Sequence, residues 1–337
     1  MTLPGKRIEQ NESLFAAKNT KTNHSITKTE HSITSMNDEN QNEKKNVPEK
    51  EKPVSFIARK PLYSFEQVIL PESVRSQFRV LRSRITNHKL LYNDWELGKI
   101  DPQGRHVAFN LYGVPGTGKT MCVEALAFEL GKMVIDISYA EIESKYVGDT
   151  GKNITAAFKA ASESGALLFF DEADSILGRR MTNVTQAADH GVNVARAVML
   201  KQLDSFDGIV AFATNLSKNF DNAFVRRIAQ HIEIPLPDAE GRRMLWEKMI
   251  SLKVPGRELL DWNRLVQESE GFSGGDIKNA VVNGLANTAS LEENQRIATI
   301  EIFITEIGNI HHAKQNVGTT TPVKVKEEIL DKMPENL

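Results

Sequence analysis

The chain has 337 residues, of which 40% are hydrophobic and 26% charged, and its formal net charge at pH 7 is -2. This length can bury the core of one large domain with a smaller domain beside it, and the charge gives no electrostatic attraction to nucleic acid or to an anionic membrane. The single cysteine allows no internal disulfide, the histidines form no zinc-binding pattern, and no segment resembles a membrane span or a signal-peptide core, so we expect a soluble cytoplasmic protein.

Residues 1–55 differ from the rest of the chain in composition. They are rich in Asn, Lys, Glu, Thr and Ser and poor in large apolar side chains. Such a segment cannot bury enough surface to offset the entropy lost on ordering, which predicts a disordered tail. The tail is either a solvated leader or a tether for a substrate or partner. Residues 65–93 are expected to form an entry segment and a first helix.

A phosphate-binding loop is expected at residues 113–120, which match G-x-x-x-x-G-K-[ST] at every fixed position. A buried strand is predicted before it at residues 107–112, and a helix after it at residues 121–130, ended by Gly131. Backbone N–H groups of such a loop surround phosphates at a helix N-terminus, so the chain should bind ATP or GTP. Lys119 would contact the β- and γ-phosphates and Thr120 a magnesium ion. The expected nucleotide contacts are Gly113, Val114, Pro115, Gly116, Thr117, Gly118, Lys119, Thr120 and Met121.

Two adjacent carboxylates follow the next apolar segment. The strand predicted within residues 165–174 ends at Asp171 and Glu172, at the edge of a parallel sheet where ligands bind. Asp171 would hold Mg²⁺, while Glu172 would orient and deprotonate the water that attacks the γ-phosphate. Paired acids at this point also suit an ordinary helix N-terminus. The upstream phosphate loop favours the catalytic interpretation.

A third strand, within residues 208–215, places Asn215 where it would touch the attacking water or the γ-phosphate. A short helix after it ends with Arg226 and Arg227. Cations are favourable at any helix C-terminus, but the order of the motifs favours a catalytic role for both arginines. From residue 238 onward the pattern predicts helices only, at residues 240–252, 257–270, 273–289 and 299–314.

With these motifs in order, residues 63–312 resemble the AAA family of the AAA+ ATPases. Residues 113–120 match Walker A, residues 167–172 Walker B and Asn215 sensor 1. Arg226 and Arg227 match the arginine fingers, and residues 271–277 match the G-x-S-G-A-D-I element, which implies nucleotide contacts at Gly274 and Gly275.

The resemblance implies a three-layer α/β P-loop NTPase domain with a parallel sheet, at residues 56–237, and a small helical lid domain at residues 238–316. A flexible tail would follow at residues 317–337. The cofactors would be ATP and Mg²⁺. The subunits would form a ring, usually a hexamer, with ATP between neighbours and arginine fingers acting in trans.

Residues 144–154 are similar to the first pore loop of the protein-translocating branch, which includes katanin, spastin and the proteasomal ATPases. The resemblance implies that Lys145, Tyr146 and Val147 contact the client polypeptide, with Tyr146 as the gripping aromatic. An aromatic residue in a loop is more often a packing residue. Residues 181–192 would be the second pore loop.

Some positions depart from the family pattern. Val114 stands where Pro is common, residues 68–71 replace a Gly-Gly turn near the adenine, and Gly275 replaces Ala. No sensor 2 arginine stands out, which leaves Arg226 and Arg227 to supply the positive charge.

The sequence thus favours an ATPase that remodels or unfolds a protein partner by threading it through a central pore. The alternatives are a motor or loader acting on nucleic acid, which would show a basic patch, and a nucleotide-gated scaffold. Among remodellers, a microtubule severer, a disassembly factor and a bacterial remodeller of a HORMA-type protein stay open.

Overall fold

The computed structural model describes residues 55–101, 104, 106–138, 142, 149–178, 187–215 and 220–316. All described residues belong to one compact unit, which lies within Lys52–Leu337. The two tails expected at residues 1–55 and 317–337 lie outside this part, apart from residue 55.

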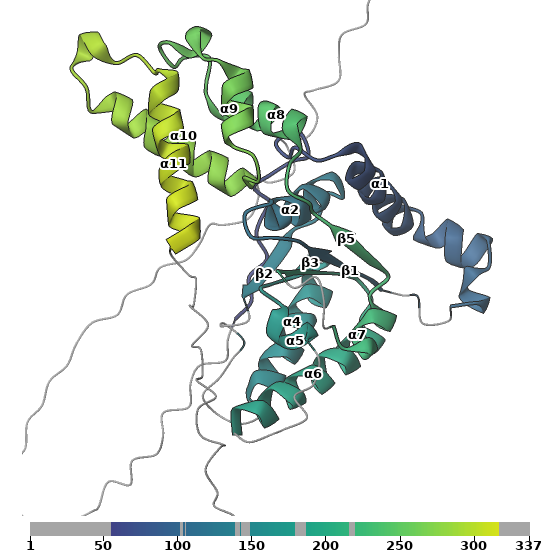
Figure 1. Ribbon diagram of the computed structural model, residues 1–337. Coiled ribbons are helices and arrows are strands. Elements are labelled where there is room, and N and C mark those ends of the chain that lie inside the picture. The colour runs from purple at the N-terminus through teal and green to yellow at the C-terminus, as the bar shows by residue number, and fades with distance from the viewer. Residues whose placement is uncertain are drawn as a thin grey trace, which may run out of the picture. The chain divides into compact units, whose positions relative to one another are not determined.

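Five parallel strands form the central sheet, in the order β2-β3-β4-β1-β5 (Figure 1). Their bounds are β1 Val107–Tyr112, β2 Val134–Ser138, β3 Leu167–Asp171, β4 Ile209–Thr214 and β5 Gln230–Glu233. Since parallel strands end at a common edge, the loops after β1, β3 and β4 meet there. The sheet confirms the expected α/β class, although neither β2 nor β5 was predicted from the sequence.

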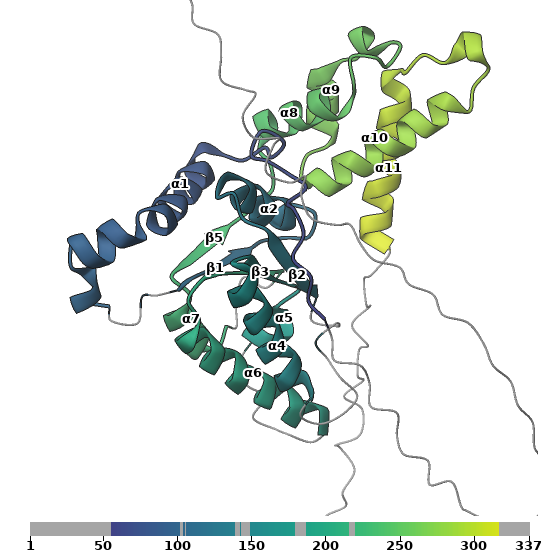
Figure 2. The same ribbon diagram turned by 180° about the vertical axis from the view of Figure 1, so that it is seen from behind.

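Helices cover both faces of the sheet, which gives the three expected layers (Figures 1 and 2). One face packs against α1 (Glu72–Thr86) and α2 (Lys119–Glu129). The other packs against α4 (Asp149–Ser164), α5 (Asp174–Leu177), α6 (Ala187–Ser205) and α7 (Asn222–Arg227). Side chains along β3 alternate between the two cores, with Leu167 and Phe169 in one and Leu168 and Phe170 in the other. A π-helical turn η1 (Leu90–Asp94) and a 3-10 turn η2 (Leu97–Lys99) follow α1.

After β5, the described residues form helices only. These are α8 (Ala239–Met249), the 3-10 turn η3 (Arg257–Leu259), α9 (Trp262–Glu268), α10 (Gly274–Ala289), the 3-10 turn η4 (Glu293–Gln295) and α11 (Ile300–Asn316). They enclose a core of their own around Trp246, Phe272 and Phe303. The boundary expected between residues 237 and 238 stays a prediction.

The prediction of a single helix at residues 257–270 is wrong. The structure has η3 and α9 instead, because Leu260 is extended and the Asp261 side chain caps a new helix, accepting hydrogen bonds from the N–H groups of Asn263 (3.0 Å) and Arg264 (3.1 Å).

Both expected pore loops are too long at their C-terminal ends. Helix α4 already begins at Asp149, so Gly151 lies within a helix. A Cβ atom at Gly151 would lie 3.2 Å from Cγ2 of Val198 on α6, which indicates that this glycine permits close helix packing. Helix α6 begins at Ala187, inside the expected second loop. Residues Lys145, Tyr146 and Val147 lie outside the described residues. Within the described part of the chain, no helix is long and apolar enough to cross a membrane.

Candidate nucleotide site

The loop between β1 and α2 has the backbone expected of a phosphate-binding loop. Gly116 has a φ of +81°, and Gly118, which precedes α2, has a φ of +96°. Both angles are positive, in a backbone region that residues with a Cβ atom disfavour. At Gly116 a Cβ atom would lie 2.6 Å from the Ser273 hydroxyl oxygen. Glycine is therefore required for the local conformation and for the approach of residue 273. Val114, Pro115 and Thr117 complete the loop, and the Thr117 hydroxyl donates to the Val114 carbonyl (3.0 Å).

The ammonium group of Lys119 lies at the centre of the site. It donates to the carbonyl oxygens of Gly113 (2.9 Å) and Val114 (3.1 Å) and to Oδ1 of Asn215 (2.8 Å). Lys119 is only 8% exposed. Burial lowers its pKa, and the carboxylates of Asp171 and nearby Asp174 oppose that shift. The side chain thus joins the phosphate loop to the end of β4 and brings Lys119 and Asn215 together; their catalytic roles stay predictions.

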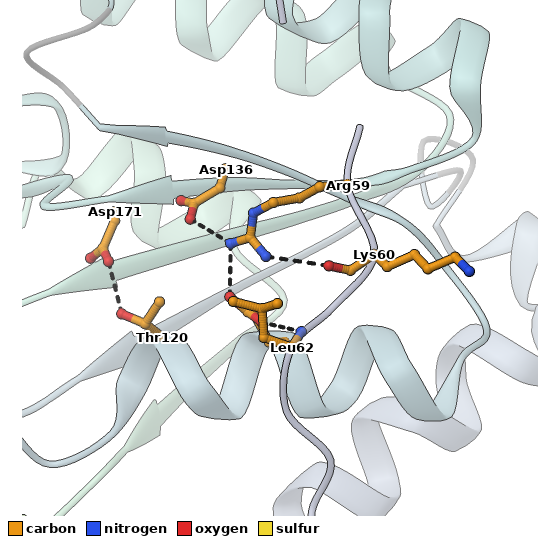
Figure 3. A network of polar contacts seen from close by, with 7 residues as sticks. Arg59, Lys60, Leu62, Thr120, Asp136 and Asp171 are labelled. Atoms are coloured by element: carbon orange, nitrogen blue, oxygen red, sulfur yellow. Dashed lines mark hydrogen bonds and ion pairs between the residues drawn. The ribbon is translucent and has the colours of Figure 1, made fainter. Parts of the chain in front are cut away.

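Two oxygen donors expected to bind Mg²⁺ are in contact. The Thr120 hydroxyl, in the first turn of α2, donates to Oδ2 of Asp171 (2.8 Å), at the end of β3 (Figure 3). Hydroxyl and carboxylate oxygens are ligands that Mg²⁺ favours when it also binds nucleotide phosphates. The loop, Lys119 and this oxygen pair fit a nucleotide with Mg²⁺.

Glu172 is exposed beside the oxygen pair, and its φ of 52° places its backbone in the left-handed region. Its N–H group donates to Oδ1 of Asp171 (2.8 Å), and the next N–H group, of Ala173, donates to the Ala213 carbonyl (2.9 Å). These bonds turn the chain directly after β3 and leave the Glu172 carboxylate accessible. Such a carboxylate can act as a general base on a bound water.

Asp174 is a polar residue of the site to which the sequence analysis assigned no role. Its Oδ1 accepts hydrogen bonds from the Asn215 N–H group (3.0 Å) and from the Thr214 hydroxyl. It thereby joins the segment after β3 to the end of β4 and orients Asn215. The sequence offered one signal for Asp174: it is the second aspartate of the D-E-A-D segment, two residues after Glu172.

Arg226 and Arg227 end helix α7 but differ in their surroundings. Arg227 binds Asp204 of α6 through two hydrogen bonds, from Nε (2.6 Å) and Nη2 (2.9 Å). Its guanidinium holds the pKa of Asp204 below the usual range. Arg226 is exposed, and its side chain has no hydrogen bond or ion pair with any residue that the structure describes. The two neighbouring arginines therefore cannot have identical roles in this conformation.

The start of α10 touches the phosphate loop. The N–H group of Gly275 donates to the Gly116 carbonyl (2.9 Å), and Gly274 precedes it in the first turn of the helix. Ser273 caps α10 in a capping box with Asp276. Met121 lies in the first turn of α2. The predicted contacts at Gly274, Gly275 and Met121 thus lie around the loop.

Comparisons with known proteins agree with this geometry. Residues 109–236 match the model of the "ATPase family associated with various cellular activities (AAA)". The chain is 32% identical over 212 residues to the proteasome-activating nucleotidase of Methanopyrus kandleri, covering 61% of this chain and 48% of the relative. It is 33% identical over 217 residues to the 26S proteasome subunit RPT4 of Saccharomyces cerevisiae, covering 62% and 48%. It is 28% identical over 276 residues to the proteasome-activating nucleotidase of Saccharolobus solfataricus, covering 79% and 67%. The alignments thus span about half the length of the first two relatives.

Proposed function

The chain carries an ATPase domain of the AAA family, and from this premise we propose that it hydrolyses ATP with Mg²⁺ to remodel or unfold a protein partner. The observation that carries the proposal is the contact of Lys119 with Asn215 and of Thr120 with Asp171, because these contacts gather the phosphate-binding and metal-binding groups at one edge of the sheet.

Each group has a separate task in hydrolysis. On nucleotide binding, Lys119 would exchange its carbonyl partners for phosphate oxygens. Thr120 and Asp171 would hold the metal ion, which would neutralise charge on the phosphates. Glu172 accepts a proton from the attacking water, and Asn215, held by Asp174, orients that water.

We further propose that the subunits form a homo-oligomeric ring, with a hexamer as the expected size. Arg226, exposed and unbound among the described residues, would supply positive charge to a neighbour's site, and Arg227 would hold helix α7 in place. Tyr146, with Lys145 and Val147, would grip the client in the pore.

Two relatives are named as proteasome-activating and a third as a 26S proteasome subunit, which supports a protein as the substrate. The identity of the client, including a HORMA-type protein, and a cytoplasmic location stay predictions.

The test compares two variants of the site. Lys119→Ala should abolish ATP binding, because it removes the direct phosphate contact. Glu172→Gln should keep ATP binding and stop turnover, because it keeps the shape of the side chain and loses only the base. Nucleotide affinity and phosphate release are measured for both. Lys159→Ala, at an exposed lysine of α4, is the control and should behave like the wild type.

Substrate class is tested in the same assay. Unfolded protein should raise the turnover of the wild-type chain, and DNA or RNA should not. Stimulation by nucleic acid alone would overturn the remodelling proposal, and equal loss of ATP binding in both variants would contradict the separate roles of Lys119 and Glu172. In a pull-down with ATP, the Glu172→Gln variant should stay ATP-bound and retain the client.

A further inference from the structure

Arg59, which belongs to none of the nucleotide motifs, pairs with two carboxylates near Thr120 and Asp171, the pair expected to bind the metal ion. Nη2 of Arg59 lies 2.8 Å from Oε1 of Glu124 and 2.9 Å from Oδ2 of Asp136 (Figure 3). The Glu124 side chain is only 2% exposed. A carboxylate so far from water is costly unless it is paired and hydrogen-bonded, so Arg59 is required for its burial.

The backbone around Arg59 is fixed to the same elements. Arg59 and Val134 exchange two backbone hydrogen bonds (2.9 and 2.8 Å), which place the segment antiparallel to the first residue of edge strand β2. The N–H group of Leu62 donates to Oε2 of Glu124 (2.6 Å), the second oxygen of the buried carboxylate. Residues 59–62 thus form a strap, bound at one point to β2 and at another to α2.

Glu124 and Asp136, the two partners of Arg59, lie on elements that carry or adjoin Thr120 and Asp171. Glu124 lies four residues after Thr120 on α2, so the two side chains project from the same face of the helix. Asp136 lies on β2, which pairs with β3 and places Ser138 opposite Asp171. Arg59 therefore ties the helix that carries Thr120 to the strand beside Asp171.

Arg59 also affects the electrostatics of this site through its positive charge. Burial raises the pKa of Asp136, Arg59 opposes that shift, and the nearby carboxylates of Asp171 and Glu124 add to it. Two carboxylates thus share one guanidinium group, and the carboxylate of Asp171 lies near enough to Asp136 to affect its pKa. Without Arg59, Glu124 and Asp136 would lack their counter-ion and would repel each other. The two side chains would move apart, and α2 would shift relative to β2.

We propose that Arg59 is a positioning residue for the ATP–Mg²⁺ site: by tying Glu124 of α2 to Asp136 of β2, it keeps Thr120 and Asp171 at the spacing that binds the metal ion. The proposal rests on the function proposed above. It also makes residues 59–62 part of the ATPase module, so that displacement of the chain before residue 59 would alter metal binding.

The test uses the full chain with Arg59→Gln and measures binding of a fluorescent, non-hydrolysable ATP analogue. In a Mg²⁺ titration at fixed nucleotide, the half-saturating Mg²⁺ concentration should rise about tenfold, the effect expected of groups that orient metal ligands. Affinity for the analogue in EDTA should stay unchanged. Arg59→Lys should restore part of the wild-type behaviour, because an ammonium group keeps the charge but lacks the planar fork that reaches both carboxylates.

The matched control is Arg82→Gln. This substitution removes another arginine that pairs with α2, at Glu129 (3.1 Å), at the opposite end of the helix from Thr120. It should leave the Mg²⁺ requirement unchanged. A folded Arg59→Gln protein with the Mg²⁺ requirement of the wild type, or an equal shift in Arg82→Gln, would overturn the proposal.

Two further results are decisive. If Arg59→Gln does not fold, as judged by its thermal melting, the triple variant with Glu124→Gln and Asp136→Asn removes the unpaired charges, and it should fold and still require more Mg²⁺. A wild-type chain that binds the analogue but does not hydrolyse ATP would overturn the proposed function. The binding titration would still decide the role of Arg59.

Discussion

Glu172 has a backbone conformation that few side chains tolerate. Its φ of 52° lies in the left-handed region, where a Cβ atom crowds the following carbonyl oxygen at a cost of about 1–2 kcal/mol. Glu172→Gly should therefore be more stable than Glu172→Ala by about 1 kcal/mol, the reverse of the usual order for these two residues. Both variants should lack ATP turnover, because both lose the base.

Urea unfolding of the two variants measures this difference. Gly165→Ala, at a glycine with a φ of +65° and no atom within 4 Å of the added Cβ, is a control for the cost of the same conformation away from the site. If Glu172→Ala were the more stable of the pair, the strain at residue 172 would not exist in the folded protein.

The residues that the sequence could predict are those whose pattern is local. The phosphate loop and the Asp171–Glu172 pair each lie within a few consecutive positions. Asp174, Arg59 and Asp204 could not be assigned roles in this way, because their partners lie 41, 65 and 23 residues away at Asn215, Glu124 and Arg227. Such contacts depend on the order of strands in the sheet, which a single sequence does not display.

The same limit applies to secondary-structure elements. The strands β3 and β4 are apolar along their length because both of their faces are covered, so they were predictable. Strand β2 lies at the edge of the sheet and carries Asp136 and Ser138 among its five residues, so it lacks a continuous apolar pattern. The start of α4 was missed because Gly151 resembles a loop residue until its neighbour Val198 is known.

Helix α7 gives a prediction about its two arginines. Arg227 binds Asp204, and the two side chains are 32% and 39% exposed, so Arg227→Ala should lower the free energy of unfolding by no more than about 1 kcal/mol. Arg226→Ala should leave that free energy unchanged and still abolish ATP turnover. Chemical denaturation and ATPase assays on the adjacent substitutions separate the two roles.

A double-mutant cycle adds the control for α7. Asp204→Ala should lower stability as much as Arg227→Ala, and the two together should cost less than their sum, because they remove the same ion pair. Equal destabilisation by Arg226→Ala and Arg227→Ala would show that the structural difference between these residues has no energetic consequence.

At the scale of the whole molecule, the proposed ring requires that each active site combine two subunits. One subunit supplies the phosphate loop and Glu172, and its neighbour supplies Arg226 across a head-to-tail interface. Lys119→Ala and Arg226→Ala should each be inactive alone. Mixed in equal amounts, with free exchange of subunits, they place an intact loop next to an intact arginine at about a quarter of the interfaces, whatever the ring size.

The ATPase rate of the mixture should therefore approach about a quarter of the wild-type rate, if the interfaces act independently. The matched control mixes Lys119→Ala with Glu172→Gln. Both substitutions damage the same side of the interface, so every site in that mixture lacks a required group and no activity should return. Dilution should lower the wild-type rate per subunit as rings dissociate. A mixture of Lys119→Ala and Arg226→Ala that stays inactive while its subunits demonstrably exchange, or a monomer that is fully active at every dilution, would refute the shared site.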